Sequence, residues 1–421
     1  MNTTIFDEEY SQLLQAAFSE EGYRVSLFLY HLEEISILYE QRISYLDDPE
    51  LVWTDLHELV GSKLEAHINA LVIGEDLALA LCKKYTQEGD FGELFGAVAL
   101  FCRQNRFDLF LSVLENTDPQ DEERYKAILD ALCAELPLSW GVPLSEKVLD
   151  DTFAPWTPLV ITVLGYHRIS CDSFLETCVE KGYITPELFW TIGRLGLVSL
   201  IKKLKDPALD SSDPILHTEA ARTFLRLKRS DIAKKIFQKS PDPVYELFAG
   251  GEPVDRSPLS HGIYGAYSSV PLLLSFLEDE AKGSDAALAL LLISGAELYE
   301  DHFVPEEIDQ DILFDEEKEK LARGEPLYPP GEEPGITVRR ICQNQEKWQL
   351  WFKQNKERFS ADGRYRLGKK YTLESVKESL KRPLFQLALR QILIDELAIV
   401  FDCELNLEPD MSVEKQWRML V

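Results

Sequence analysis

The sequence lacks any run of about 18 uncharged apolar residues, the length that a membrane-spanning helix needs. Its first residues, MNTTIFDEEYSQLL, have neither the basic stretch nor the apolar stretch of a secretion signal. We therefore expect no contact with a membrane, and we predict a cytoplasmic location.

Positive charge is also scarce. The 421 residues hold 44 Lys and Arg against 73 Asp and Glu, which gives a formal net charge of −29. A chain this negative repels phosphate groups, so general binding to nucleic acid or to anionic membranes is excluded. A basic protein partner remains compatible with this charge.

Closely paired metal ligands are missing as well. No CxxC occurs, and no Cys/His pair has the spacing of a zinc site. His57 and His67 stand ten residues apart in HELVGSKLEAH, which is too far for the HExxH arrangement. We predict no metal, no cofactor and buried free thiols at most of the seven cysteines, which are Cys82, Cys102, Cys133, Cys171, Cys178, Cys342 and Cys403.

Catalytic signatures are equally hard to find. There is no GxSxG. His167 and Cys171 are four residues apart, but no orienting acid or oxyanion arrangement accompanies them. The acidic segment 309–320 lacks the glycine of a calcium loop. We expect no catalytic residues, and an enzyme on a helical scaffold stays a second alternative.

What the sequence does contain is helical periodicity. Residues 25–46 and 55–85 carry apolar side chains at i, i+3, i+4 and i+7. Helix starts are indicated by SPDPVYELF, TPELFWTIG and SEKVLDD, each with a capping residue or an early proline. Alternating runs between Asn-Gly or Asp-Gly turns are almost absent, so few strands are expected.

One stretch of the chain indicates a repeat. FWTIGRLGLVSLIKKL (189–204) aligns with HGIYGAYSSVPLLLSFL (261–277) when Gly193 is set on Gly265. The same pattern of a helix, a short polar turn and a second helix occurs in residues 97–116 and 220–237. A period of about 33 to 40 residues of helix pairs is typical of an α-solenoid. Gly193, Ala221 and Gly265 are then expected where neighbouring helices approach closely.

The chain also resembles a family of bacterial proteins with HEAT-like repeats and no assigned catalytic activity. The resemblance rests on an LEAH segment, an LLISGAEL segment and a GRYRLGK signature, within the ranges 31–42, 56–82, 269–300, 349–380 and 386–402. Members of this family often sit near type VI secretion gene clusters. The resemblance implies an accessory, adaptor or immunity role around toxin delivery.

The predicted fold is all-α, an α-solenoid of HEAT-like helix pairs with an N-terminal helical region and a C-terminal helical cap. We expect four segments, namely an N-terminal helical region (1–90), HEAT-like repeats (91–303), an acidic Pro/Gly-rich linker (304–335) and a C-terminal cap with a basic island (336–421). Residues 297–333 hold fourteen acidic and three basic residues, whereas 336–390 hold five acidic and fourteen basic ones. These stretches could pair with each other or present two surfaces to a partner.

Six residues near the C-terminus are candidates for a protein interface. Aromatic side chains and arginines cluster there, as they do at interface hot spots. The cluster consists of Trp348, Trp351, Phe352, Arg364, Tyr365 and Arg366. Two alternatives remain open: the aromatic residues could cap the end of the helical array, or the cluster could bind single-stranded nucleic acid, which the net charge opposes.

The expected function is that of a non-enzymatic protein-binding scaffold. Its most concrete form is an adaptor or chaperone-like accessory protein of a type VI secretion system, with a toxin or a spike or cargo component as partner. The first alternative is an immunity protein that neutralises a basic toxin. The oligomeric state does not follow from the sequence.

Overall fold

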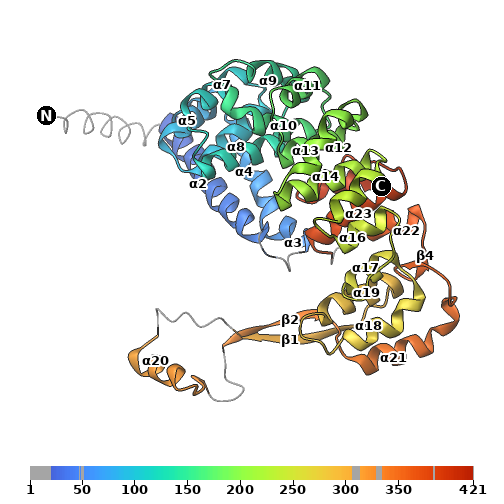
Figure 1. The fold of residues 1–421 in the computed structure, drawn as a ribbon. Helices are drawn as coiled ribbons and strands as arrows, with labels where there is room; N and C mark the ends of the chain where they lie inside the picture. The colour runs from blue at the N-terminus through green and yellow to red at the C-terminus, as the bar shows by residue number, and fades with distance from the viewer. Residues whose placement is uncertain are drawn as a thin grey trace. The chain divides into compact units, whose positions relative to one another are not determined.

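The computed structural model describes residues 20–46, 48, 52–305, 313–328, 334–382 and 385–420. Within these ranges the chain is mainly helical, and its strands form two small antiparallel sheets of two strands each (Figure 1). The prediction of an all-α, solenoid-like fold is confirmed. Each of these helices is too short or too polar to cross a membrane.

The chain divides into two compact units. Unit 1 comprises residues 1–250 and 376–421, and unit 2 comprises residues 251–375. Helix α22 (Leu373–Ser379) contains the second boundary. The finer division into four segments stays a prediction.

Unit 1 begins with helices that pack around one long helix. That helix, α2, contacts α4, α5 and α6 through buried side chains such as Leu32, Ile35 and Tyr39. The elements are α2 (Glu20–Leu46), α3 (Trp53–Leu56), the π-helical turn η1 (His57–Gly61), α4 (Ser62–Ile73) and α5 (Glu75–Glu88).

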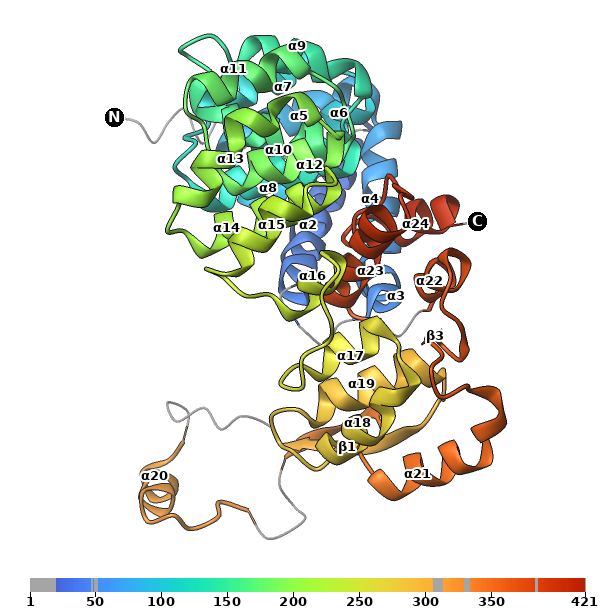
Figure 2. The same ribbon diagram turned by 45° about the vertical axis from the view of Figure 1, so that its right-hand side comes forward.

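A row of helices follows, in which each member packs against the next (Figure 2). This inner row consists of α6 (Phe91–Arg103), α8 (Glu122–Glu135), α10 (Thr157–Tyr166), α12 (Pro186–Leu195) and α14 (Pro214–Arg226). The helices between and after them are α7 (Phe107–Asn116), η2 (Leu138–Trp140), α9 (Gly141–Lys147), η3 (Ala154–Trp156), α11 (Asp172–Glu180), η4 (Val198–Leu200), α13 (Ile201–Asp210), α15 (Ser230–Phe237) and α16 (Pro243–Phe248).

Four of the inner helices end in the same way. A residue with positive φ follows the last turn, and the next amide donates back to a carbonyl five residues earlier, which is the bond of a Schellman cap. The positive-φ residues are Asn105, Arg168, Gly196 and Lys228. The bonds are Arg106 N to Phe101 O (2.8 Å), Ile169 N to Leu164 O (2.9 Å), Leu197 N to Ile192 O (3.2 Å) and Arg229 N to Phe224 O (2.7 Å). The recurring cap supports the repeat that the sequence predicts.

The register of the sequence alignment is wrong by three residues. The structural equivalent of Gly265 is Gly196, because both have positive φ at a helix end and both precede a 3₁₀ turn. Gly193 instead lies inside α12, where a Cβ atom would come within 2.9 Å of Thr223 Oγ1 on α14. The predicted close approach of helices is therefore confirmed at Gly193 and does not hold at Gly265.

The predicted helix starts are confirmed in two cases out of three. Thr185 caps α12 by accepting from Leu188 N, and Asp242 caps α16 by accepting from Val244 N and Tyr245 N. SEKVLDD does not begin a helix, because α9 already starts at Gly141 and ends at Lys147. The first turn of α9 contains Pro143, a residue that is tolerated there, and SEKVLDD begins only in its second turn.

The end of the chain returns to unit 1. Helix α23 (Leu387–Val400) packs against α14 and α16, and α24 (Val413–Leu420) packs against α3. Between these two helices, residues 401–412 run without regular structure.

Unit 2 is built on two packed helices, α17 and α19, whose C-terminal ends both contact residues 365–368, with α18 and α21 beside them. A pair of strands, β1 and β2, leaves this helical body, and a second short pair, β3 and β4, lies against α19. The elements are α17 (Pro258–Tyr264), η5 (Tyr267–Ser269), α18 (Val270–Phe276), α19 (Gly283–Ser294), β1 (Tyr299–Pro305), α20 (Asp315–Ala322), β2 (Gly335–Ile341), α21 (Gln345–Gln354), η6 (Lys356–Arg358), β3 (Tyr365–Arg366) and β4 (Lys369–Lys370). The sequence did not predict the β1–β2 pair, because its strands are 29 residues apart and no tight turn joins them.

Candidate functional site

The structure places four of the six predicted interface residues in the interior of unit 2. Trp348, Phe352, Tyr365 and Arg366 are buried, so they do not form an exposed surface. Trp348 donates its indole N–H to the Cys342 carbonyl at 2.6 Å, and Phe352 packs between Trp348 and Trp351. These aromatic side chains thus belong to the core of unit 2, and the alternative that they cap the end of the helical array stays a prediction.

Trp351 and Arg364 are the two that stay partly exposed. The guanidinium of Arg364 lies between the rings of Tyr264 and Tyr371, at 4.1 and 4.0 Å from their centres. Its Nε donates to Tyr264 O at 2.7 Å. An interface role for these two residues stays a prediction, because nothing in the structure tests it.

The GRYRLGK signature (363–369) has a clear structural role. Its backbone pairs with the ends of two helices, through Tyr365 N to Gly265 O (2.7 Å) and Leu367 N to Leu292 O (2.6 Å). Gly265 and Gly295, at those ends, have positive φ and leave no room for a Cβ atom against the signature. The signature thus binds α17 and α19 together within unit 2.

The β1–β2 pair forms an arm with exposed apolar side chains near its tip (Figure 1). Val304 and Ile336 are cross-strand partners and are 40% and 65% exposed, and Phe303, on the opposite face, is 43% exposed. Nearer the helical body, Tyr299 and Ile341 are partly covered. We call residues 299–305 and 335–341 the arm.

The connection between the two strands is strongly acidic. Residues 306–334 contain eleven Asp and Glu against three Lys and Arg. Its one described helix, α20, is preceded by Phe314, whose side chain is 79% exposed. The calcium loop that the sequence excluded in 309–320 falls partly outside the described residues. An acidic segment therefore adjoins the apolar tip of the arm.

Comparisons with protein-family models, with curated proteins and with solved structures find no match.

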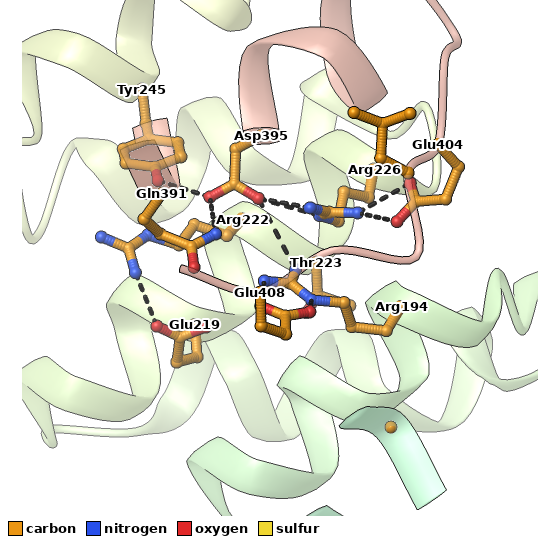
Figure 3. A network of polar contacts seen from close by, with 12 residues as sticks. Arg194, Glu219, Arg222, Thr223, Arg226, Tyr245, Gln391, Asp395, Glu404 and Glu408 are labelled. Carbon is orange, nitrogen blue, oxygen red and sulfur yellow. Dashed lines mark hydrogen bonds and ion pairs between the residues drawn. The ribbon is translucent and has the colours of Figure 1, made fainter. Parts of the chain in front are cut away.

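A second candidate site lies in unit 1, where arginines of the inner row meet carboxylates of the chain's own C-terminal segment (Figure 3). Arg226 on α14 contacts Asp395 at 2.5 Å and Glu404 at 2.6 Å. Arg194 on α12 contacts Glu408 at 2.8 Å and Asp395 at 3.5 Å. We call these five side chains the arginine clamp.

Two further side chains complete the environment of Asp395. Tyr245 donates its hydroxyl to Asp395 Oδ2 at 2.6 Å, and Gln391 Nε2 donates to the same oxygen at 3.1 Å (Figure 3). Arg168 reaches Glu408 at 2.7 Å. Sequence reasoning missed the clamp, although Arg194 and Arg226 each stand two residues before a positive-φ cap residue.

The electrostatics of the clamp favour the charged forms. Burial alone would raise the pKa of Asp395, but Arg226 and Arg194, with the hydrogen bond from Tyr245, lower it well below its usual range. Burial would likewise lower the pKa of Arg194, and its carboxylate partners Glu408 and Asp395 raise it above its usual value. The clamp thus fixes the C-terminal segment on the inner row, with Asp395 and Arg194 held in their charged forms.

A cavity of about 370 Å³ lies in the same unit, beside α4, α8 and α10. Its polar lining residues include Arg42, Asp130, Tyr166 and Asp410, together with the Cys133 thiol. Burial raises the pKa of Tyr166 and of Cys133, and nearby Asp410 raises both further. The thiol is therefore held in its neutral form, which is a poor nucleophile.

The histidines that the sequence considered do not come together. His67 faces His31, with 3.0 Å between their Nδ1 atoms, and His57 faces Glu414 at 3.4 Å. His167 Nε2 donates to the Leu132 carbonyl at 2.8 Å, so it is turned toward the backbone rather than toward Cys171. In the part of the chain that the structure describes, no group of three His, Cys, Asp or Glu side chains is placed to hold a metal ion.

The cysteines behave as predicted. All seven are free, and five of them are buried: Cys82, Cys102, Cys171, Cys178 and Cys342. Burial raises the pKa of the Cys82 thiol to about 12.

Proposed function

We propose that the chain is a protein-binding scaffold and that its partner docks on the arm of unit 2. The observation that carries this proposal is the pair Val304 and Ile336, which is exposed on a ribbon of only two strands. An isolated two-stranded ribbon is marginally stable in water, and exposed apolar patches mark interaction sites. A partner that covers the tip would bury this surface and stabilise the arm.

The expected partner is a basic protein with an apolar patch. The arm supplies apolar side chains, and residues 306–334 supply an excess of eight negative charges beside them. Complementary charge accelerates association and selects among partners, and it weakens as salt rises. The net charge of −29 acts in the same direction.

The biological setting we propose is a type VI secretion system, which the resemblance to HEAT-like proteins implies. As an adaptor, the chain would carry a toxin or a spike or cargo component. As an immunity protein, it would neutralise a basic toxin, and the acidic connection favours this second form. Deleting an adaptor gene should abolish delivery only, whereas deleting an immunity gene should poison the producing cell.

The test compares two double variants in affinity purification from the organism that encodes the chain, with mass spectrometry. V304S/I336S removes the apolar tip of the arm. V198S/I215S is the matched control, because Val198 and Ile215 are 60% and 67% exposed on unit 1. We expect one basic protein to co-purify with the wild type and with the control, to be lost with V304S/I336S, and to decrease at moderate salt.

The proposal is wrong if the co-purified protein is retained by V304S/I336S, or if nothing is enriched above background with the wild type. Circular dichroism of each variant checks that the helices are intact. The arm contributes little to the core, so its variants are expected to fold.

A further inference from the structure

Unit 1 contains a second candidate binding site, which does not depend on the arm. The cavity of about 370 Å³ falls within the size range of sites for small organic molecules. Its lining contains both polar and apolar side chains. The apolar part of the lining consists of Leu56, Leu64, Ile68, Phe95, Leu136 and Val413, among others.

Two carboxylates of the lining, Asp130 and Asp410, differ in their partners. Asp130 accepts hydrogen bonds from Tyr39 and Lys126, both at 2.9 Å, and Arg42 lies 3.9 Å away. Asp130 is thus held by donors and cations of the protein itself.

Asp410 has no such cation. Its carboxylate accepts from the Tyr166 hydroxyl at 3.2 Å, while Arg42 donates to its backbone carbonyl at 3.0 Å. Among the described residues, no Lys, Arg or His nitrogen forms an ion pair with the Asp410 side chain. Burial raises the pKa of Asp410, partly opposed by Arg42 and reinforced by Glu408 and Asp130. The Asp410 carboxylate therefore has no cationic partner within ion-pair distance in the described part of the chain, and an ammonium group placed there would favour its charged form.

The other carboxylates of the lining have cationic partners. Glu65 and Glu135 both pair with Arg103, at 2.5 and 2.9 Å, and Asp130 pairs with Lys126. Burial lowers the pKa of His167, which keeps that imidazole neutral. Asp410 is thus the carboxylate of the lining that a cationic ligand would neutralise, whereas its charge would repel an anionic ligand.

We propose that this cavity binds an organic amine. Its ammonium group would lie at Asp410 and Tyr166, and its apolar body would contact the apolar part of the lining. The ammonium would provide the charge that Asp410 lacks and would donate hydrogen bonds to its carboxylate. A free amine and a lysine side chain of a partner share this chemistry.

The experiment is isothermal titration calorimetry of the full chain at pH 7 with tryptamine, phenethylamine and hexylamine. Indole-3-propionate is the anionic counterpart of tryptamine, and Nα-acetyl-lysine methylamide represents a lysine side chain. We expect at least one free amine to bind with one site per chain and at least about tenfold more tightly than indole-3-propionate. If only the lysine derivative binds, the ligand is a side chain of a protein partner.

Two variants locate the site. D410N should weaken amine binding at least about tenfold, whereas D402N, in the same segment but exposed and outside the cavity, should leave it unchanged. A134F places a ring in the cavity and should abolish binding. Thermal unfolding of each variant shows that it is folded.

The inference is overturned if none of the four amines binds, if indole-3-propionate binds as tightly as tryptamine, or if folded D410N and folded A134F bind like the wild type. None of these outcomes bears on the arm, so the two proposals fail separately.

Discussion

At the scale of single residues, the arginine clamp brings four buried charged side chains of unit 1 together, namely Arg194, Arg226, Asp395 and Glu408. Asp395 is 1% exposed and contacts Arg194, Arg226, Tyr245 and Gln391. A buried ion pair gains little over a well-packed apolar pair, but removing one partner leaves an uncompensated charge. The clamp therefore makes unit 1 sensitive to changes at Asp395.

We expect D395N to lower the free energy of unfolding by about 3–5 kcal/mol, because both guanidiniums lose part of their counter-charge in the interior. Urea denaturation followed by circular dichroism measures this change. The control is D402N, because Asp402 pairs with Lys228 at 3.0 Å with its side chain 86% exposed. An exposed pair contributes at most about 1 kcal/mol, so equal losses in the two variants would contradict the clamp.

The clamp also predicts a dependence of stability on pH. The pKa of Asp395 is depressed in the folded protein, so the folded state binds its proton less tightly than the unfolded state does. Its contribution is fully present above the ordinary aspartate pKa of about 4 and is lost as pH falls below that value. Between pH 4 and pH 3, the free energy of unfolding should fall more steeply in the wild type than in D395N. Parallel curves would contradict this expectation.

At the scale of elements, α12 and α17 each end in a glycine with positive φ, and the two glycines serve different purposes. In α12, Gly196 has φ +67° and no neighbouring atom within 4 Å of an added Cβ. In α17, Gly265 has φ +80° and lies directly against the carbonyl of Tyr365 in the GRYRLGK signature. The first glycine only ends a helix, whereas the second also allows a distant segment to dock.

We expect G196A to cost about 1–2 kcal/mol, the strain of a side chain at positive φ. G265A should cost more, because the new methyl group also displaces the signature. Hydrogen exchange at the Tyr365 and Leu367 amides should accelerate in G265A and stay slow in G196A, since those amides bond to Gly265 O and Leu292 O. Unchanged exchange in G265A would show that the signature is held by its side chains alone.

At the scale of the whole molecule, the two units differ in how the chain builds them. Unit 2 is one continuous segment, 251–375, whereas unit 1 needs both 1–250 and 376–421. The second part supplies Asp395, Glu404 and Glu408 to the arginines of the inner row. Unit 1 is therefore incomplete without the end of the chain.

We expect a chain truncated after residue 375 to keep the unfolding transition of unit 2 and to lose that of unit 1. The isolated fragment 251–375 provides the reference transition and should unfold cooperatively. Differential scanning calorimetry of the full chain, the truncated chain and the fragment makes the comparison. A cooperative transition of unit 1 in the truncated chain would show that the inner row is stable without the clamp.

The candidate sites were predicted less well than the fold. The arginine-aromatic cluster was found from the sequence, yet Trp348, Phe352, Tyr365 and Arg366 are buried. Local composition is the same for a hot spot and for a small core, since both are rich in aromatic side chains and arginine. Which of the two forms depends on what packs over the residues.

The sequence by itself determined that the chain is helical, where two of its helices begin, and that helix pairs recur. These properties follow from spacing and capping within a few residues, as at Thr185 and Asp242. Only the tertiary structure decided that Asp395 pairs with Arg226, 169 residues away, that β1 pairs with β2, and that Asp410 lines a cavity with no cation of the described residues paired to its carboxylate. Ion pairs and strand pairing between distant segments leave no local pattern, because any arginine or acid of the chain could serve until folding brings one pair together.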